Sequence, residues 1–195
     1  YMSKRNVELK AGYYYHIYNR GNNYQDIYLH RDNYVYFLQQ FKKYLIPETL
    51  DVIAYCLMPN HYHFLIYLKT DFLSEKMQKF VLSYTKSINI RYKRVGGLFQ
   101  GRYKNIIVDT DEYLLHLSRY IHLNPWQANL VKKAEDWEFS SYREYLGMRP
   151  GKIPKTEVIL SYFKNESSNV YESYRKFVES YQEKDKKMIE KLTFD

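Results

Sequence analysis

The sequence predicts an α+β fold of the ferredoxin-like, RRM-like type, in which elements in the order βαββαβ form an antiparallel sheet with two helices on one face. Two observations predict it. Short segments rich in aromatic and β-branched residues alternate with longer segments whose apolar residues recur every three or four positions. Clusters of turn residues separate these segments. Because 195 residues is close to the size of one ordinary domain, we expect one main domain.

The first strand is predicted by its residue types, and the first helix by the spacing of its apolar residues. Residues 13–19 are mostly aromatic or β-branched, and turn residues follow at 20–23. A helix is expected from Asp32 to about Leu45, because its apolar side chains are spaced by three and four. Pro47 ends it.

The middle of the chain supplies the next four elements of the order. Residues 54–66 read as two short apolar strands that fold back at Pro59–Asn60. A long second helix is expected over residues 72–92, and a further strand over 105–109. In a sheet of this order the first and third strands are central and adjacent, so the third strand should form a stiff platform.

The rest of the chain is predicted to be helical. A third helix is expected over Thr110–Asn124, with Pro125 directly after it. A short helix at 140–146 precedes a linker rich in glycine and proline. We therefore expect the main domain to span residues 1–149, followed by a C-terminal tail, residues 150–195, that is helical in two pieces.

Charge and aromatic content indicate the kind of partner. The chain has 30 lysines and arginines against 22 acidic residues, a net charge of +8, which favours a polyanion such as nucleic acid. It also has 24 tyrosines and 10 phenylalanines. Aromatic side chains beside cations suit unpaired bases better than a closed duplex, although many of these rings must serve the core.

One cysteine and the absence of long apolar segments indicate the location. Cys56 cannot form an intrachain disulfide or a cysteine-based zinc site. The sequence shows no signal core and no run of about 20 apolar residues, so we expect a soluble, cytoplasmic protein with no membrane partner.

Two histidines, His61 and His63, are the first candidate site. Side chains alternate between faces along a strand, so both imidazoles lie on one face while Tyr62 and Phe64 lie on the other. At about 6 to 7 Å apart along the backbone, they can converge on one divalent metal ion. The alternative is that they are surface or hydrogen-bonded histidines without a ligand.

The third helix carries a second candidate. His116, Tyr120 and Asn124 are spaced by four and share one helix face. His122 lies about 200° around the helix from Tyr120, which favours a structural role for it.

Five segments, taken together and in this order, resemble the single-tyrosine HUH transposases, and especially the transposase-like proteins associated with repetitive extragenic palindromes (REPs). They are residues 15–21 (YHIYNRG), 58–63 (MPNHYH), 98–104 (LFQGRYK), 119–125 (RYIHLNP) and 140–142 (SSY). The segments are distributed in order over roughly residues 13–146, which is far more specific than two histidines alone.

The resemblance implies a role for each candidate. His61 and His63 match the two histidines that bind a divalent metal, Mg²⁺ or Mn²⁺, which polarises the scissile phosphate. Tyr120 matches the nucleophile that forms a 5′-phosphotyrosine. Asn124 stands where related enzymes have a further polar metal ligand, although it could instead cap the helix end before Pro125.

Five polar residues near these segments are candidates for DNA contact, with solvated surface charge as the alternative. They are Asn19, Arg20, Arg94, Arg102 and Lys104. The chain departs from the family pattern after Pro125, where Trp126–Asn129 replaces the common Val-Arg-Ala-Gly. Asn can adopt the left-handed conformation that glycine provides, so the turn should survive.

The leading hypothesis is a metal-dependent transposase or endonuclease that nicks and rejoins single-stranded or hairpin DNA. One alternative is a domesticated module that binds palindromic repeats without cutting them, and another is a metal hydrolase that uses bound water. The sequence leaves open whether the protein is a monomer or a homodimer that exchanges the tyrosine helix.

Overall fold

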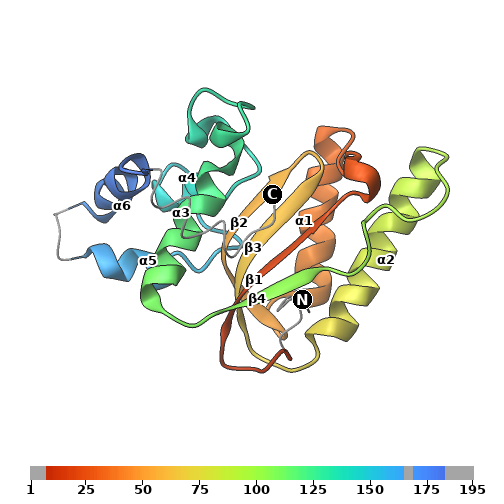
Figure 1. Cartoon of the computed structure of the whole chain (residues 1–195), viewed down its shortest axis with the longest axis horizontal. Helices are drawn as coiled ribbons and strands as arrows, with labels where there is room; N and C mark the ends of the chain where they lie inside the picture. The colour runs from red at the N-terminus through yellow and green to blue at the C-terminus, as the bar shows by residue number, and fades with distance from the viewer. Residues whose placement is uncertain (1–7, 165–168, 183–195) are drawn as a thin grey trace, which may run out of the picture.

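The computed structural model describes residues 8–164 and 169–182, and it has the predicted ferredoxin-like architecture (Figure 1). Four antiparallel strands form one sheet in the order β2-β3-β1-β4, so the first and third strands are central and adjacent as expected. The strands are β1 (Tyr14–Arg20), β2 (Leu50–Met58), β3 (His61–Leu68) and β4 (Lys104–Val108). The helices are α1 (Arg31–Leu45), α2 (Leu73–Arg91), α3 (Asp111–Gln127), α4 (Tyr142–Tyr145), α5 (Glu157–Leu160) and α6 (Val170–Glu179), with 3₁₀ turns at Asn22–Tyr24, Ala134–Asp136 and Ser161–Phe163.

The two faces of the sheet are covered by different helices. Helices α1 and α2 pack on one face, and α3 with α5 and α6 lies on the other, at the left of Figure 1. The alternation along β3 sends Tyr62 and Phe64 toward α1 and α2, while Leu65 joins the α3 side. His63 therefore faces α3, since it shares the parity of Leu65.

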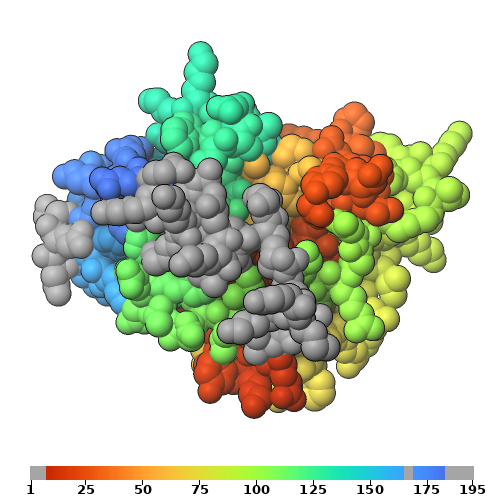
Figure 2. Space-filling view, in the orientation of Figure 1, coloured from red at the N-terminus to blue at the C-terminus, as the bar shows by residue number. Residues whose placement is uncertain are grey.

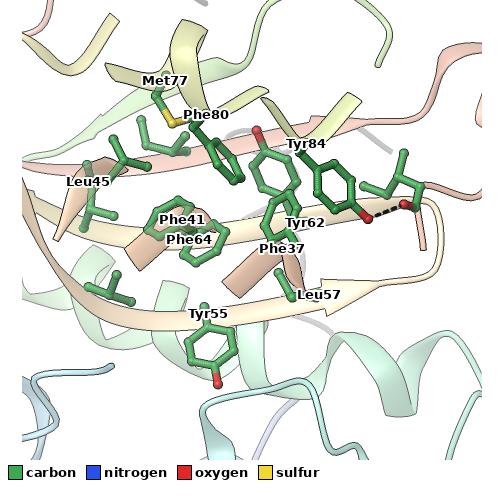
Figure 3. Close-up of a cluster of buried hydrophobic side chains, with 14 of the residues drawn as sticks. Phe37, Phe41, Leu45, Tyr55, Leu57, Tyr62, Phe64, Met77, Phe80 and Tyr84 are labelled. Carbon is green, nitrogen blue, oxygen red and sulfur yellow. Dashed lines mark hydrogen bonds between the residues drawn. The ribbon is translucent and has the colours of Figure 1, made fainter. Parts of the chain in front are cut away.

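Aromatic rings fill the space between the sheet and the α1–α2 layer (Figure 3). Phe41 stacks on Phe64 with ring centroids 4.2 Å apart, and Phe37 meets Phe80 edge-on at 4.8 Å. The Tyr84 hydroxyl donates a hydrogen bond of 2.7 Å to the carbonyl of Ile27, which satisfies its polar end inside the core. The period-3.6 apolar stripes of α1 and α2 are thus explained by burial against one sheet face.

The predicted end of the third helix was wrong. Helix α3 continues through Pro125 to Gln127, so Asn124 does not cap the helix end. Proline fixes φ near the helical value and removes only its own N–H donor. Hydrogen bonding resumes beyond it, because Ala128 N–H donates to the Asn124 carbonyl at 2.9 Å.

Two smaller expectations on the C-terminal side are confirmed. Asn129 has φ +55°, the left-handed conformation expected where the family pattern has glycine. The described part of the tail forms α5 and α6, and both pack into the α3 core.

Among the described helices, none combines the length and apolarity that crossing a membrane requires.

Replacing Phe37 by alanine should lower the free energy of unfolding by about 3–5 kcal/mol, because this fully buried ring contacts Phe80, Tyr84 and Phe64. Urea denaturation measures the loss. Phe72→Ala is the matched control, since Phe72 is 65% exposed and its loss should cost under about 0.5 kcal/mol. Equal effects of the two substitutions would contradict the assignment of this core.

Candidate active site

The register of the two central strands places two histidines beside two residues of β1. Tyr18 lies opposite His63 and Arg20 lies opposite His61. Opposed residues share a sheet face, so these four side chains lie together on the side of α3. The imidazole rings of His61 and His63 are 5.0 Å apart, with an interplanar angle of 84°.

His61 is oriented by its neighbour in the β2–β3 turn. Its Nδ1 lies 2.7 Å from Asn60 Oδ1, an acceptor, so Nδ1 carries the proton. The Asn60 Nδ2 group donates to the Tyr24 carbonyl at 3.2 Å, which fixes the orientation of the amide. A neutral imidazole has one proton, and His61 Nε2 is therefore the lone-pair atom.

His63 is oriented by a third histidine that the sequence analysis missed. Nδ1 of His63 lies 2.9 Å from Nε2 of His16 on β1, and their rings stack at 5.1 Å. Burial lowers the pKa of His16 to about 3, and burial followed by the nearby His61 and His16 holds the pKa of His63 well below its usual value. Both shifts favour the neutral forms of His16 and His63. Within the described residues, His63 Nε2 is buried and accepts or donates no hydrogen bond.

Tyr120, on helix α3, lies next to His63. Its ring lies 5.7 Å from the His63 ring in an edge-on arrangement, and the residue is 7% exposed. Asn124, one turn later, donates from Nδ2 to the Tyr120 carbonyl at 3.0 Å. This leaves the amide oxygen of Asn124 as its only atom able to ligate a cation. His116, one turn earlier, lies against Phe177 of α6.

A buried polar cluster fixes the position of α3. His122 contacts the Tyr174 hydroxyl of α6 through Nδ1 and the Ser141 hydroxyl through Nε2, both at 2.8 Å. Ser118 on α3 also contacts the Tyr174 hydroxyl at 3.1 Å, and Ser141 Oγ donates to the Tyr55 carbonyl of β2. The helix that carries Tyr120 is thereby tied to both the sheet and the tail, which agrees with the structural role expected for His122.

Arg20 and Lys104 are predicted DNA-contact residues that, together with Asn19, line a pocket shared with the two histidines. The Arg20 guanidinium lies 4.1 Å from the Tyr24 ring centroid and its Nε donates to Gln100, and Lys104 Nζ lies 5.9 Å from the Tyr18 ring. The pocket is lined by Tyr18, Asn19, Arg20, Tyr24, Asn60, His61, Tyr62, His63, Gln100 and Lys104.

The other three predicted DNA-contact residues have different surroundings. The Asn19 side chain is buried and donates to the Gly101 carbonyl at 3.1 Å. Arg94 follows α2 and donates to Gln25 at 2.7 Å, while Arg102 is exposed in the segment before β4. Of these three residues, only Asn19 contributes to the lining of the pocket.

The missed residues, His16 and Tyr24, had weak signals in the sequence. His16 stands two positions before Tyr18, so it shares the face of the histidine pair once the pairing of β1 with β3 is known. Tyr24 stands among turn residues, where an aromatic side chain is not needed for a core.

The described residues contain no group of three or more histidine, cysteine, aspartate or glutamate side chains that could hold a metal ion. Of the candidate donors, the two imidazoles lie together, and the Asn124 amide is on the helix that carries Tyr120. This sparse donor set leaves positions for oxygen atoms from a substrate.

Comparison with protein families identifies the class as a transposase family. The family model described as "Transposase IS200 like" matches residues 10–124, more than half of the chain, and the chain belongs to this family. It is also similar to a Haemophilus influenzae protein assigned as a REP-associated tyrosine transposase, at 26% identity over 120 residues. That match covers 54% of this chain and 66% of the relative, just under two thirds of its length.

A solved structure shares the fold. It is the structure of a REP-associated tyrosine transposase bound to a REP hairpin, with a TM-score of 0.63 and 20% sequence identity. The similarity covers 77% of this chain and 89% of that one. The predicted family and fold are thus confirmed.

The buried His122 should make folding sensitive to acid. Burial lowers its pKa to about 3, whereas an unfolded histidine titrates near 6.5, so the unfolded state binds the extra proton between these values. The stabilisation is complete above pH 6.5 and is lost as the pH falls toward 3. Between pH 7 and pH 5 the wild type should therefore lose about 2 kcal/mol more than His122→Gln. Urea unfolding of both proteins at the two pH values measures the difference, and parallel losses would refute this assignment.

Proposed function

We propose that this chain is a metal-dependent transposase or endonuclease that nicks and rejoins single-stranded or hairpin DNA through a 5′-phosphotyrosine on Tyr120. The observation that carries the proposal is the position of Tyr120. A helix outside the βαββαβ unit places its ring 5.7 Å from His63, on the face where His61 and His63 lie together. Family membership and the sequence motifs around these three residues support the same assignment.

The donor atoms fit a divalent cation. His61 and His63 each use Nδ1 for a contact within the protein, which directs Nε2 toward the site. His63 and its neighbour His16 are neutral, as metal-binding imidazoles must be. We assign His61, His63 and the Asn124 amide oxygen as ligands of Mg²⁺ or Mn²⁺, with Mn²⁺ the better partner for imidazole. Bound there, the cation would withdraw charge from the scissile phosphate.

The remaining steps are changes of bonding at the scissile phosphate, with the Tyr120 oxygen as the attacking atom. The Tyr120 oxygen forms a bond to phosphorus, the bond from phosphorus to the 3′ oxygen breaks, and the phenol proton ends on that oxygen as a 3′-hydroxyl. The phosphotyrosine ester conserves the energy of the broken bond, so a later 3′-hydroxyl can reverse the reaction and join a new strand. Since α3 is anchored through His122 to its own sheet and tail, we propose that Tyr120 acts with the histidines of the same chain.

Arg20 and Lys104 are placed to bind phosphates, because both line the pocket that holds the histidines. We propose that Arg94, Arg102 and Asn19 extend this contact along the backbone of the DNA. We also propose that the chain acts in the cytoplasm. The similar solved structure is bound to a REP hairpin, which supports a hairpin as the substrate.

Tyr120→Phe should abolish the covalent adduct while DNA affinity changes less than about twofold, because it removes only the attacking oxygen. Labelled single strands copied from the DNA flanking the gene, incubated with Mn²⁺ and separated on a denaturing gel, reveal the adduct. Tyr113→Phe is the matched control, since Tyr113 lies on the same helix and is also 7% exposed. An adduct that persists in Tyr120→Phe would refute the nucleophile. Tight hairpin binding without adduct or cutting in the wild type would favour the binding-module alternative. Cutting without an adduct would favour a hydrolase.

His16→Leu should weaken Mn²⁺ binding by about 10- to 100-fold, because removal of a hydrogen-bond partner of a ligating histidine typically costs this much. For Nε2 of His63 to ligate, its proton must lie on Nδ1 and be donated to His16. Titration calorimetry measures the affinity, and ¹⁵N chemical shifts report the tautomer of His63 in the metal-free protein. His16→Gln retains an acceptor and should recover part of the affinity. Unchanged affinity in His16→Leu would show that His16 only fills space.

A further inference from the structure

We propose that Tyr24 forms a stacking subsite for one unpaired nucleobase beside the scissile phosphate. The subsite lies in residues 21–25, here called the Tyr24 loop, of which Tyr24 lines the histidine pocket. This inference rests on the proposed function and deepens it, since it names the structural feature of the DNA that the site recognises.

The Tyr24 ring is exposed at a backbone position that disfavours it. The residue is 63% exposed, and both Asn23 and Tyr24 have left-handed conformations, with φ of +51° and +57°. An aromatic residue rarely adopts such a conformation, and strained backbone of this kind clusters at ligand-binding sites. The core does not require this ring, because Tyr24 lies outside both hydrophobic clusters.

The Tyr24 loop is held rigidly against the turn that carries the histidines. Gly21 N–H donates to the Asn60 carbonyl at 2.7 Å, and Asn22 N–H donates to the Leu98 carbonyl at 2.9 Å. A Cβ atom on Gly21 would lie 1.9 Å from the Gln25 carbonyl oxygen, so the loop closes with no room for a side chain there. In Figure 2 the orange-red residues of this region stand at the surface beside the light green segment that contains Leu98. A ring held in place loses little conformational entropy when a base stacks on it.

The side-chain amide of Asn60 joins the Tyr24 loop to His61, a proposed metal ligand. Asn60 accepts from His61 Nδ1 through Oδ1 and donates to the Tyr24 carbonyl through Nδ2. A base on Tyr24 is therefore fixed relative to the imidazole that faces the phosphate. One side chain thus couples the position of the base to the position of the reacting atoms.

Charge beside the ring favours a nucleotide over an apolar ligand. The Arg20 guanidinium lies 4.1 Å from the ring centroid, and Arg20 is opposite His61 in the sheet. A base stacked on the ring would have its phosphate within reach of Arg20, which combines an aromatic platform with a cation as single-strand binding sites do. A base in a duplex is stacked on its neighbours and offers no free face, so the subsite selects an unpaired nucleotide.

The test is a scan with abasic sites on the Tyr120→Phe background, in which affinity is measured without cleavage. Single-stranded oligonucleotides copied from the DNA flanking the gene, each lacking one base, are titrated by fluorescence anisotropy. Removal of one base adjacent to the cleaved bond should weaken binding by about 5- to 100-fold, the range of one base–aromatic stack. Removal of that same base should have no effect when Tyr24 is also replaced by asparagine.

Tyr24→Asn is chosen because asparagine tolerates the left-handed backbone, so folding should be unchanged. Tyr24→Phe and Tyr24→Trp keep a ring and should keep the sensitivity to the abasic site. Tyr13→Asn is the control, since Tyr13 is 50% exposed and precedes the opposite end of β1.

Three results would overturn the proposal: no sensitive position in the scan, a sensitive position far from the cleaved bond, or the same sensitivity in Tyr24→Asn. Each of these is distinguishable from failure of the proposed function. The proposed function fails if the protein with its native Tyr120 forms no covalent adduct. The affinity scan does not depend on formation of that adduct.

Discussion

The pairing of β1 with β3 is the constraint on which the rest of the site depends. In the observed register Tyr18 lies opposite His63, Arg20 lies opposite His61, and His16 reaches Nδ1 of His63. A slip of one residue would send the β1 side chains to the α1–α2 face. That face is filled by Phe37, Phe41 and their neighbours, so the aromatic core fixes the register and the register in turn assembles the site.

Much of this arrangement follows from local pattern. The order of the elements and the faces of β3 are set by periodicity, which a sequence displays directly. The partnership of His16 with His63 depends on which strands are neighbours and in which register, and no local pattern carries that information. The end of α3 was mispredicted for the opposite reason, because the local signal of Pro125 was outweighed by tertiary packing of the helix on the sheet. The hydrogen bond from the Asn19 amide to the Gly101 carbonyl likewise joins residues far apart in the chain, so no local pattern could reveal it.

Two polar centres lie on the α3 side of the sheet. The centre around His122 positions α3, and the centre around His16 and His63 belongs to the proposed site. The His122 centre is fully hydrogen-bonded, through Ser141 and Tyr174, and such a network specifies one packing arrangement. The His16–His63 centre is different, because within the described residues His16 Nδ1 and His63 Nε2 are buried and form no hydrogen bonds. An unsatisfied buried polar atom costs about 1–3 kcal/mol. A ligand bound at His63 Nε2 would remove this cost for that atom.

The character of the donors also bears on how substrate and cation bind. Two imidazoles and one carboxamide bring no negative charge, and the described residues contain no metal-binding group of three or more histidine, cysteine, aspartate or glutamate side chains. Hard divalent cations bind such a set weakly and prefer anionic oxygen. Under the proposed function the phosphate of the DNA is that oxygen, so cation and substrate stabilise each other in the site and linkage makes the effect reciprocal. A strand that places its phosphate at His61 therefore completes the ligand set as well as supplying the reacting bond.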